Sequence, residues 1–455
     1  MDDPRRNLPS VERVLSELRT RSANGDSSLP SATEAVRSVL ADARAAMAED
    51  NALPSLEELV DEARDRMAQD RRPLLRTVIN ATGVILQTNL GRAPLSDRAI
   101  AAMNEIALGY SNLEYDLESG TRGSRHTHIR ELLRRTTGAE DGMVVNNNAA
   151  AILMVLQVFA SGREVIVSRG QAVEIGGGFR IPDVLRQSGA VLHEVGTTNR
   201  TYARDYAEAW NADSAAILRV HSSNFKVVGF TAEASLSDLA DVAHTNGGLL
   251  FDDIGSGCLL DTARFGIAHE PTVQESISSG SDLTMFSGDK LLGGPQCGII
   301  VGRAELIERL RQHPLARALR VDKLTIAALG ATLQAYGSGV ETAEIPIWRM
   351  LSCELADIER RARRWATVAG ERGSIVSSTS MVGGGSLPGE GVPTWCAALS
   401  LAASVDEAAA SLRRGTPAVV ARIADGRLLL DPRTVRPGDD EAVAEALRRL
   451  VAVVR

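Results

Sequence analysis

The sequence predicts an α/β protein whose large central domain holds a mostly parallel sheet. A small helical domain precedes it and a small α+β domain follows it. From about residue 140, seven short apolar runs alternate with helical stretches, as in proteins whose parallel sheet is covered by helices. Before residue 70, apolar residues recur at helical spacing. After about residue 335, a long helical pattern gives way to strand-like segments joined by a turn.

The elements follow in chain order. LPSVERVLSEL predicts a first helix with Ser10 as its N-cap, and two more helical patterns follow before residue 70. The predicted strands are GMVVN, REVIVS, AVLHEVG, AAILRV, GLLFD, DLTMFS and GIIVG. Next come the helix LSCELADIERRARRWATVAG, a Gly/Ser-rich break at SSTSMVGGGSLPGEG, a hairpin around Asp425-Gly426 and a final helix. We therefore expect a helical domain over 1–70, a linker over 71–90, a large domain over 91–335 and a small domain over 336–455.

The composition excludes several classes of protein. At 455 residues, 44% apolar and 24% charged, the chain resembles ordinary globular proteins. It has no long apolar run and no signal-peptide pattern, so we expect a cytoplasmic protein that does not bind membranes. The four cysteines form no CxxC pair, which argues against a disulfide framework and against a metal site. A net charge of −8 argues against a surface coated with nucleic-acid-binding charge.

Lysine is rare in this chain, which makes the lysine in SGDKLLGGPQCG informative. Of 50 basic residues, only Lys226, Lys290 and Lys323 are lysines. Arginine supplies a fixed charge equally well, but only an amine can lose its proton on desolvation and form a Schiff base. Lys290 follows a predicted strand and opens a Gly-rich loop. Lys226 lacks such a loop, and Lys323 fits an exposed first turn of a helix, so Lys290 is the candidate reactive lysine.

Two further motifs at strand ends fit the same chemistry. In VVNNNAAAILMVL a strand turns into a helix, where the amides of Asn148, Ala149 and Ala150 are expected to be free for an anion. In GGLLFDDIGSG a strand ends in Asp252 and Asp253; such a carboxylate can keep a heterocyclic nitrogen protonated, bind a metal, or cap a turn. A phosphate-binding turn, a strand-end aspartate and a strand-end lysine, in that order, are the layout expected for pyridoxal phosphate. The alternative is a structural lysine in a Gly-rich turn.

Longer motifs resemble a single family. They are INATGVILQTNLGRAPLS, YSNLEYDLESGTRGSR, VVNNNAAAILM, SRGQAVEIGGGFRIPDV, GTTNRTY, HSSNFKVVGF, DDIGSG, FSGDKLLGGPQCGIIVG and HPLARALRVDKLTIAAL. Together they resemble the bacterial selenocysteine synthases, the L-seryl-tRNA(Sec) selenium transferases. The resemblance implies a fold-type-I pyridoxal phosphate transferase, with the cofactor in the domain over 91–335 and tRNA bound by the N-terminal domain.

The resemblance also implies roles for individual residues. Lys290 would carry the cofactor's aldehyde, Asp253 rather than Asp252 would face the pyridinium nitrogen, and Asp289 would be a further catalytic residue. The cofactor phosphate would bind Asn147, Asn148, Ala149 and Ser287, and the substrate anion would bind Arg92, Arg317, Arg320 and Asn224. The i, i+3 spacing of Arg317 and Arg320 would place both on one helix face, where they could clamp a phosphate or simply be solvated.

By this resemblance the chain would convert L-seryl-tRNA(Sec) to L-selenocysteinyl-tRNA(Sec), using selenophosphate and an aminoacrylyl intermediate on the tRNA, without a metal. It would be a homo-oligomer, at least a dimer and in this family usually a decamer. The first 76 residues carry 12 basic against 15 acidic residues, so their own charge does not attract RNA. Nothing in the residues themselves distinguishes selenium from sulfur.

Two classes of alternative stay open: another pyridoxal phosphate enzyme and a non-catalytic protein. A pyridoxal phosphate-dependent β-eliminating lyase or aldolase, acting on a small amino acid or an amino sugar acid, would share the lysine and aspartate motifs but need neither the N-terminal domain nor the arginines. A desulfurase would need a mobile cysteine, whereas Cys297 heads a predicted buried strand. A non-catalytic RNA-binding or assembly protein would not need Lys290, Asp253 and Ser287.

Overall fold

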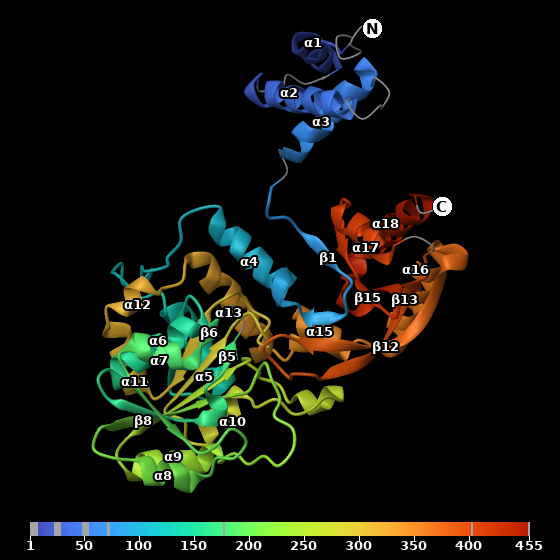
Figure 1. Ribbon diagram of the computed structural model, residues 1–455. Helices are drawn as coiled ribbons and strands as arrows, with labels where there is room; N and C mark the ends of the chain where they lie inside the picture. The colour runs from blue at the N-terminus through green and yellow to red at the C-terminus, as the bar shows by residue number, and fades with distance from the viewer. Residues whose placement is uncertain are drawn as a thin grey trace. The chain divides into compact units, whose positions relative to one another are not determined.

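The computed structural model describes residues 8–21, 29–47, 54–70, 73–175, 178–401 and 404–453 (Figure 1). The chain forms two compact units, Met1–Thr77 and Val78–Arg455. Among the described residues, no helix has both the length and the apolar character that crossing a membrane requires.

The described part of the first unit contains three helices, as predicted: α1 (Val11–Arg21), α2 (Leu29–Ala46) and α3 (Leu56–Asp70). Ser10 caps α1, since its carbonyl (3.1 Å) and its Oγ (3.3 Å) both accept from the Arg13 amide. The apolar faces of the helices form one cluster that includes Val14, Leu15, Leu18, Val36, Leu40, Leu59 and Val60. The unit therefore has a small core of its own.

The second unit is built on a seven-stranded sheet in the order β3-β11-β10-β9-β8-β4-β7. Its strands are β3 (Asp141–Val145), β4 (Glu164–Ser168), β7 (Val191–Val195), β8 (Ser214–Val220), β9 (Leu249–Gly255), β10 (Leu283–Ser287) and β11 (Gly298–Gly302). β11 is antiparallel to both its neighbours, and the remaining pairs are parallel. All seven predicted runs are strands of this sheet, which confirms the mostly parallel α/β prediction.

Helices cover both faces of this sheet (Figure 1). One face packs against α6 (Asn148–Ala160), α7 (Ile181–Ser188) and α11 (Ala304–Gln312). The other packs against α5 (Thr127–Thr137), α8 (Ala203–Ala209), α9 (Leu236–Thr245), α10 (Val273–Ser278) and α13 (Lys323–Gly337). This part of the chain also contains α4 (Asp97–Ala107), α12 (Leu315–Ala318) and the short strands β5 (Glu174–Ile175) and β6 (Phe179–Arg180). Burial on both faces explains why the strands read as continuous apolar runs.

A five-stranded sheet in the order β15-β16-β13-β12-β2 forms the C-terminal part of the unit. Its strands are β2 (Val84–Leu86), β12 (Gly373–Gly383), β13 (Gly391–Leu399), β15 (Arg422–Ala424) and β16 (Arg427–Leu430). The helices of this part are α14 (Glu341–Glu344), α15 (Pro346–Ser352), α16 (Leu355–Val368), α17 (Val405–Arg414) and α18 (Asp440–Val453). The predicted hairpin forms between β15 and β16, with Asp425 and Gly426 at φ values of 49° and 67°.

Two sequence-based expectations differ from the structure. The expected linker over 71–90 contains β2, which pairs with β12, and β1 (Val78–Asn80), which pairs with β14 (Ala418–Val420). The first part of the expected Gly/Ser-rich break, residues 377–383, belongs to β12, and only residues 384–390 form the expected loop. β1, β2 and one edge of β12 each pair with a strand distant in sequence, so local composition does not reveal them.

Asp431 joins the elements of the C-terminal sheet. Its carboxylate is fully buried and accepts hydrogen bonds from Ser380 Oγ (2.7 Å), Thr394 Oγ1 (2.9 Å) and the Arg433 amide (3.0 Å). Its own amide donates to the Ala81 carbonyl (2.9 Å). One residue thus connects β12 and β13 through its side chain, and the segment between β1 and β2 through its backbone amide.

We expect Asp431→Ala to lower the free energy of unfolding by about 3 kcal/mol, because buried hydroxyl and amide donors lose their acceptor. Urea unfolding followed by circular dichroism measures the change. Asp213→Ala, at an exposed aspartate, is the control and should stay within about 0.5 kcal/mol of the parent protein. A similar small effect for Asp431→Ala would mean that the network contributes little to stability.

Candidate active site

Lys290 is the most deeply buried of the three lysines. It is 7% exposed, whereas the side chain of Lys226 is 63% exposed and Lys323 opens α13. Lys290 follows β10 in a tight loop, where its carbonyl accepts from the Gly293 amide (2.9 Å). The next amide, of Leu291, donates to the carbonyl of Ser256, just beyond β9 (2.9 Å). These bonds fix the backbone that carries the amine.

Two glycines leave room for this amine. A Cβ atom on Gly385 would lie 2.6 Å from Cε and 2.8 Å from Nζ of Lys290, and one on Gly255 would lie 3.6 Å from Nζ. Gly385 also has a φ of 82°, which other residues rarely adopt. It belongs to the loop after β12, so the C-terminal sheet supplies a wall around the lysine. No sequence motif singles out this glycine as a site residue.

Burial lowers the pKa of the Lys290 amine below its usual value. The charge of Asp253 opposes this shift, the charge of Arg92 adds to it, and the charge of Asp289 again opposes it. An amine that gives up its proton more readily is a better nucleophile and base at neutral pH.

The alternation of side chains along β9 separates its two aspartates. Asp253 accepts a hydrogen bond at Oδ1 from Nδ2 of Asn148, the first residue of α6 (2.8 Å). Asp252 faces the other side of the sheet, where it pairs with Arg219 (3.0 Å) and accepts from the Ser276 hydroxyl (2.6 Å). Asp252 is already engaged, and the geometry favours Asp253 as the carboxylate of the site.

Burial raises the pKa of Asp253 to about 6, against the opposing effects of the Asn148 hydrogen bond and the Lys290 charge. The side chain is 2% exposed. The Asp253 carboxyl group therefore changes from protonated to ionised at about pH 6. A positively charged group beside it would hold it ionised.

Asn147, in the turn between β3 and α6, caps the N-terminus of α6 with its side chain. Asn147 Oδ1 accepts from the Ala150 amide (2.9 Å), so this amide is not free, contrary to the sequence-based expectation. Among the described residues, the amides of Asn148 and Ala149 have no acceptor, and Oδ1 of Asn148 is buried without a hydrogen-bond partner. Two free amides at a helix N-terminus favour an anion.

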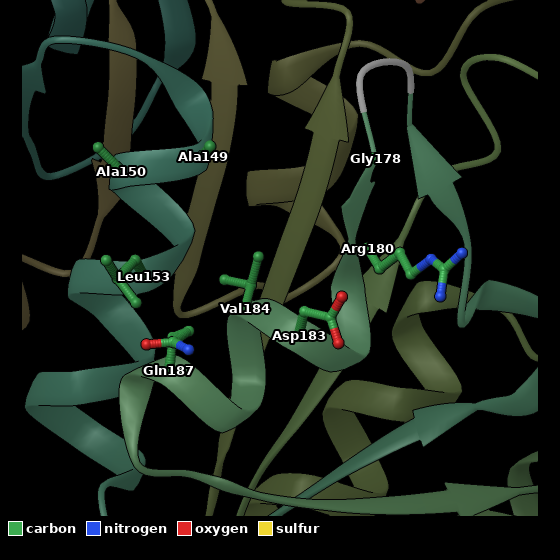
Figure 2. Close-up of a pocket in the computed structure, with 8 residues that line it drawn as sticks. All are labelled: Ala149, Ala150, Leu153, Gly178, Arg180, Asp183, Val184 and Gln187. Carbon is green, nitrogen blue, oxygen red and sulfur yellow. The ribbon is translucent and has the colours of Figure 1, made fainter.

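A pocket of about 360 Å³ adjoins this turn (Figure 2). Its lining comes from Ala149, Ala150, Leu153, Gly178, Arg180, Asp183, Val184 and Gln187. In Figure 2, Leu153 of α6 and Val184 of α7 extend into the space between the two helices. Arg180 is paired with Glu174 (2.7 Å). Because the walls from α6 are apolar, the pocket itself does not resemble an anion site.

Asp289, the residue before Lys290, forms an ion pair with Arg92, with Nη1 of Arg92 and Oδ2 of Asp289 2.8 Å apart. The Ala93 amide donates to the Asp289 carbonyl (3.2 Å), so backbone and side chain hold the two segments together. Arg92 has a φ of 61°, which is uncommon outside glycine and concentrates at functional sites. Its side chain is 35% exposed, so the guanidinium remains accessible to an anion.

Arg317 and Arg320 do not share a helix face, so that expectation is wrong. Arg317 lies in α12, which ends at Ala318, and Arg320 follows the helix and forms a β-bridge with Val145 at the end of β3. The backbone leaves the helix here because it pairs with β3. Both side chains are exposed, and the bridge brings Arg320 beside the turn that leads into α6.

Ser287 and Asn224 were also predicted as site residues. Ser287 ends β10 and is buried, three residues before Lys290. Asn224 is exposed, and its Nδ2 donates to the Glu174 carbonyl (3.1 Å). Ser287 thus lies at the strand end that leads to Lys290. The side chain of Asn224 is instead held by the carbonyl of Glu174.

His221 and Glu270 adjoin the site but were not predicted. The His221 amide donates to the Asp253 carbonyl (2.9 Å). Nε2 of His221 lies 3.4 Å from Oε1 of Glu270, and both atoms are buried without a hydrogen bond among the described residues. Glu270 is 2% exposed. The position of His221 at a strand end was a usable signal, whereas Glu270 comes from a loop that carried none.

The residues fit pyridoxal phosphate. A buried amine of lowered pKa suits its aldehyde, and a buried carboxylate suits a protonated ring nitrogen. The free amides at the start of α6 suit its phosphate. The absence of a side chain at Gly385 leaves space around the amine that a Cβ atom would fill.

The fold is similar to that of a solved structure. The structure of D-glucosaminate-6-phosphate ammonia-lyase matches with a TM-score of 0.59 and 22% identity, covering 84% of this chain and 97% of that one. This likeness shows the fold, and it extends over most of the chain.

Sequence comparison identifies the family. The model described as L-seryl-tRNA selenium transferase matches residues 78–436, and the selenocysteine synthase N-terminal model matches residues 5–44. The L-seryl-tRNA(Sec) selenium transferase of Geobacter sulfurreducens is 48% identical over 98% of this chain and 99% of its own length. That of Hyphomonas neptunium is 44% identical over 98% of both chains. The chain belongs to the L-seryl-tRNA selenium transferase family.

In the protein without cofactor, Asp253 should make stability depend on pH. The pKa of the folded state, about 6, exceeds that of an ordinary aspartate, 3.8, so the folded state binds this proton more tightly. The stabilisation is complete below about pH 4 and is lost as the pH rises through 6. Raising the pH from about 5 to 7.5 should therefore lower the free energy of unfolding by on the order of 1 kcal/mol, as Asp253 loses its proton.

Urea unfolding at both pH values, in the parent protein and in Asp253→Asn, measures this contribution. The variant should lack this part of the pH dependence. The same dependence in both proteins would contradict a titrating, buried Asp253.

Proposed function

We propose that this chain converts L-seryl-tRNA(Sec) to L-selenocysteinyl-tRNA(Sec), with pyridoxal phosphate at Lys290 and selenophosphate as selenium donor. The family match over nearly the whole chain supports the reaction. The single structural observation that carries the proposal is the buried Lys290 amine in the same site as the buried Asp253 carboxylate.

Each residue has a separate task in this proposal. Lys290 would hold the aldehyde, Asp253 would keep the proton on the ring nitrogen, and the cofactor phosphate would bind Asn147, Asn148, Ala149 and Ser287. When bound, the cofactor supplies an electron sink for charge that develops at the substrate's Cα. The Lys290 amine, with its lowered pKa, is suited to accept the Cα proton once substrate has taken its place.

The arginines would bind the selenium donor. Asp289 orients Arg92 through their 2.8 Å ion pair, which leaves guanidinium donors for a phosphate-type anion. Arg320, beside the start of α6, and Arg317 carry exposed guanidinium groups that would complete this subsite, with Asn224 as a further contact. These side chains hold an anion as it arrives and as phosphate leaves.

The family match favours this reaction over a small-molecule lyase or aldolase and over a non-catalytic RNA-binding or assembly protein. A desulfurase is disfavoured because Cys297 is fully buried and burial raises the pKa of its thiol.

We also infer a homo-oligomer. Leu108, Tyr110 and Leu117 are large apolar side chains that lie in one segment and are largely exposed. Such a group of side chains favours burial against another subunit.

The test is an absorbance titration of the cofactor-loaded protein with seryl-tRNA(Sec), free L-serine and a non-cognate seryl-tRNA. We expect the cofactor spectrum to shift with seryl-tRNA(Sec) alone, and selenophosphate then to yield selenocysteinyl-tRNA. Lys290→Ala should show neither. A shift with free serine and none with the tRNA would instead indicate a small-molecule lyase.

We expect Gly385→Ala to reduce cofactor incorporation, read as absorbance of the purified protein, by at least about tenfold. The added Cβ would lie 2.8 Å from Nζ of Lys290. Gly389→Ala is a matched control, since Gly389 lies in the same loop, has a φ of 78° and has nothing within 4 Å of its Cβ position. Equal incorporation in the two variants would show that Gly385 does not shape the site.

A further inference from the structure

An exposed aromatic side chain lies at the same sheet edge as Lys290. Phe230, in the connection between β8 and α9, is 84% exposed, and nearby Val228 is 85% exposed. Arg200, which follows β7, places its guanidinium 5.9 Å from the centre of the Phe230 ring. Folding leaves most of this apolar surface in contact with water, and such exposed surface is typical of a site that binds a partner.

Hydrogen bonds fix the loop that carries this ring. The Phe230 carbonyl accepts from Asn199 Nδ2 (2.6 Å) and from Arg200 Nε (3.1 Å). The Ala232 amide donates to the Asn199 carbonyl (3.0 Å), and the Thr201 amide donates to the Ala232 carbonyl (2.9 Å). The ring is therefore presented on a pre-organised surface, which reduces the entropy lost on binding.

This surface continues toward the lysine site. β7 and β8 run parallel to β9 and β10, so the loops that follow all four strands lie at one edge of the sheet. Lys226, four residues before Phe230, pairs with Glu390 (3.4 Å). The Glu390 carbonyl accepts from the Val382 amide (3.0 Å) and closes the loop that carries Gly385 beside the amine.

We propose that Phe230 and Arg200 form the stacking site for the 3′-terminal base of the RNA that carries the seryl group. This rests on the proposed function. In an aminoacyl-tRNA the amino acid is esterified to the terminal nucleotide of a single-stranded end. When the serine amine reaches Lys290, that base must lie at the mouth of the same site. Single-stranded bases stack on exposed aromatic rings, and the cations of Arg200 and Lys226 complement the RNA phosphates.

The test measures the affinity of the full-length, cofactor-loaded protein for tRNA(Sec) with an intact 3′ end and for the same tRNA without its terminal CCA. Phe230→Ala should weaken binding of the intact tRNA about tenfold, the loss expected for one stacked base. Phe230→Trp should retain the affinity. The trimmed tRNA should bind the parent protein and Phe230→Ala equally. Leu355→Ala, at an exposed apolar residue at the start of α16 and outside both proposed surfaces, is the control.

Equal affinity of the parent protein and Phe230→Ala for the intact tRNA overturns the proposal, as does an equal loss for both RNAs. A smaller assembly for Phe230→Ala, measured by light scattering, also overturns it, because a second copy of the chain would then be the occupant. Failure of the proposed function would look different from failure of this proposal. The parent protein would then make no selenocysteinyl-tRNA, while Phe230→Ala would still weaken binding of the intact tRNA and not of the trimmed tRNA.

Discussion

The exclusion of water from one lysine amine is the constraint on which the site depends. Desolvation disfavours the charged ammonium, so a buried lysine needs both neighbouring charges and a tightly fitted surrounding. Different parts of the chain meet these needs. β10 delivers Lys290, β9 carries Asp253, and the loop after β12 brings Gly385 against the amine. The amine is thus buried only when the central sheet and the C-terminal sheet are both formed.

The C-terminal sheet therefore takes part in the chemistry without donating a reactive group. β12 is held on one side by β13 and on the other by β2 from the start of the unit. Asp431 adds side-chain hydrogen bonds to the same region. A change in these contacts, far from Lys290 in sequence, would move the Gly385 loop and admit water to the amine. Because the family model matches residues 78–436, it spans both β2 and this loop.

Sequence-based prediction succeeded where the signal is local. Apolar runs predict the seven central strands because both faces of that sheet are buried, and the rarity of lysine singles out Lys290. It failed where a distant partner decides. β12 is polar but pairs with β2 from the start of the unit, and Arg320 leaves its helix to bridge Val145. Glu270 gives no signal, since its contact with His221 depends on the fold of a loop. The choice between adjacent aspartates required knowing which face of β9 meets α6.

The scarcity of lysine has a consequence for the chemical integrity of the protein. Besides Lys290 the chain has only Lys226, which pairs with Glu390, and Lys323, whose amine donates to the Gly109 carbonyl (2.7 Å). Guanidinium groups stay protonated and do not condense with simple aldehydes as amines do. If Lys290 holds a reactive aldehyde, as we propose, the protein offers few competing amines for stray adducts. Its many arginines keep the solubilising charge but offer no amine for acetylation or Schiff-base formation, so damage of this kind would be concentrated at very few positions.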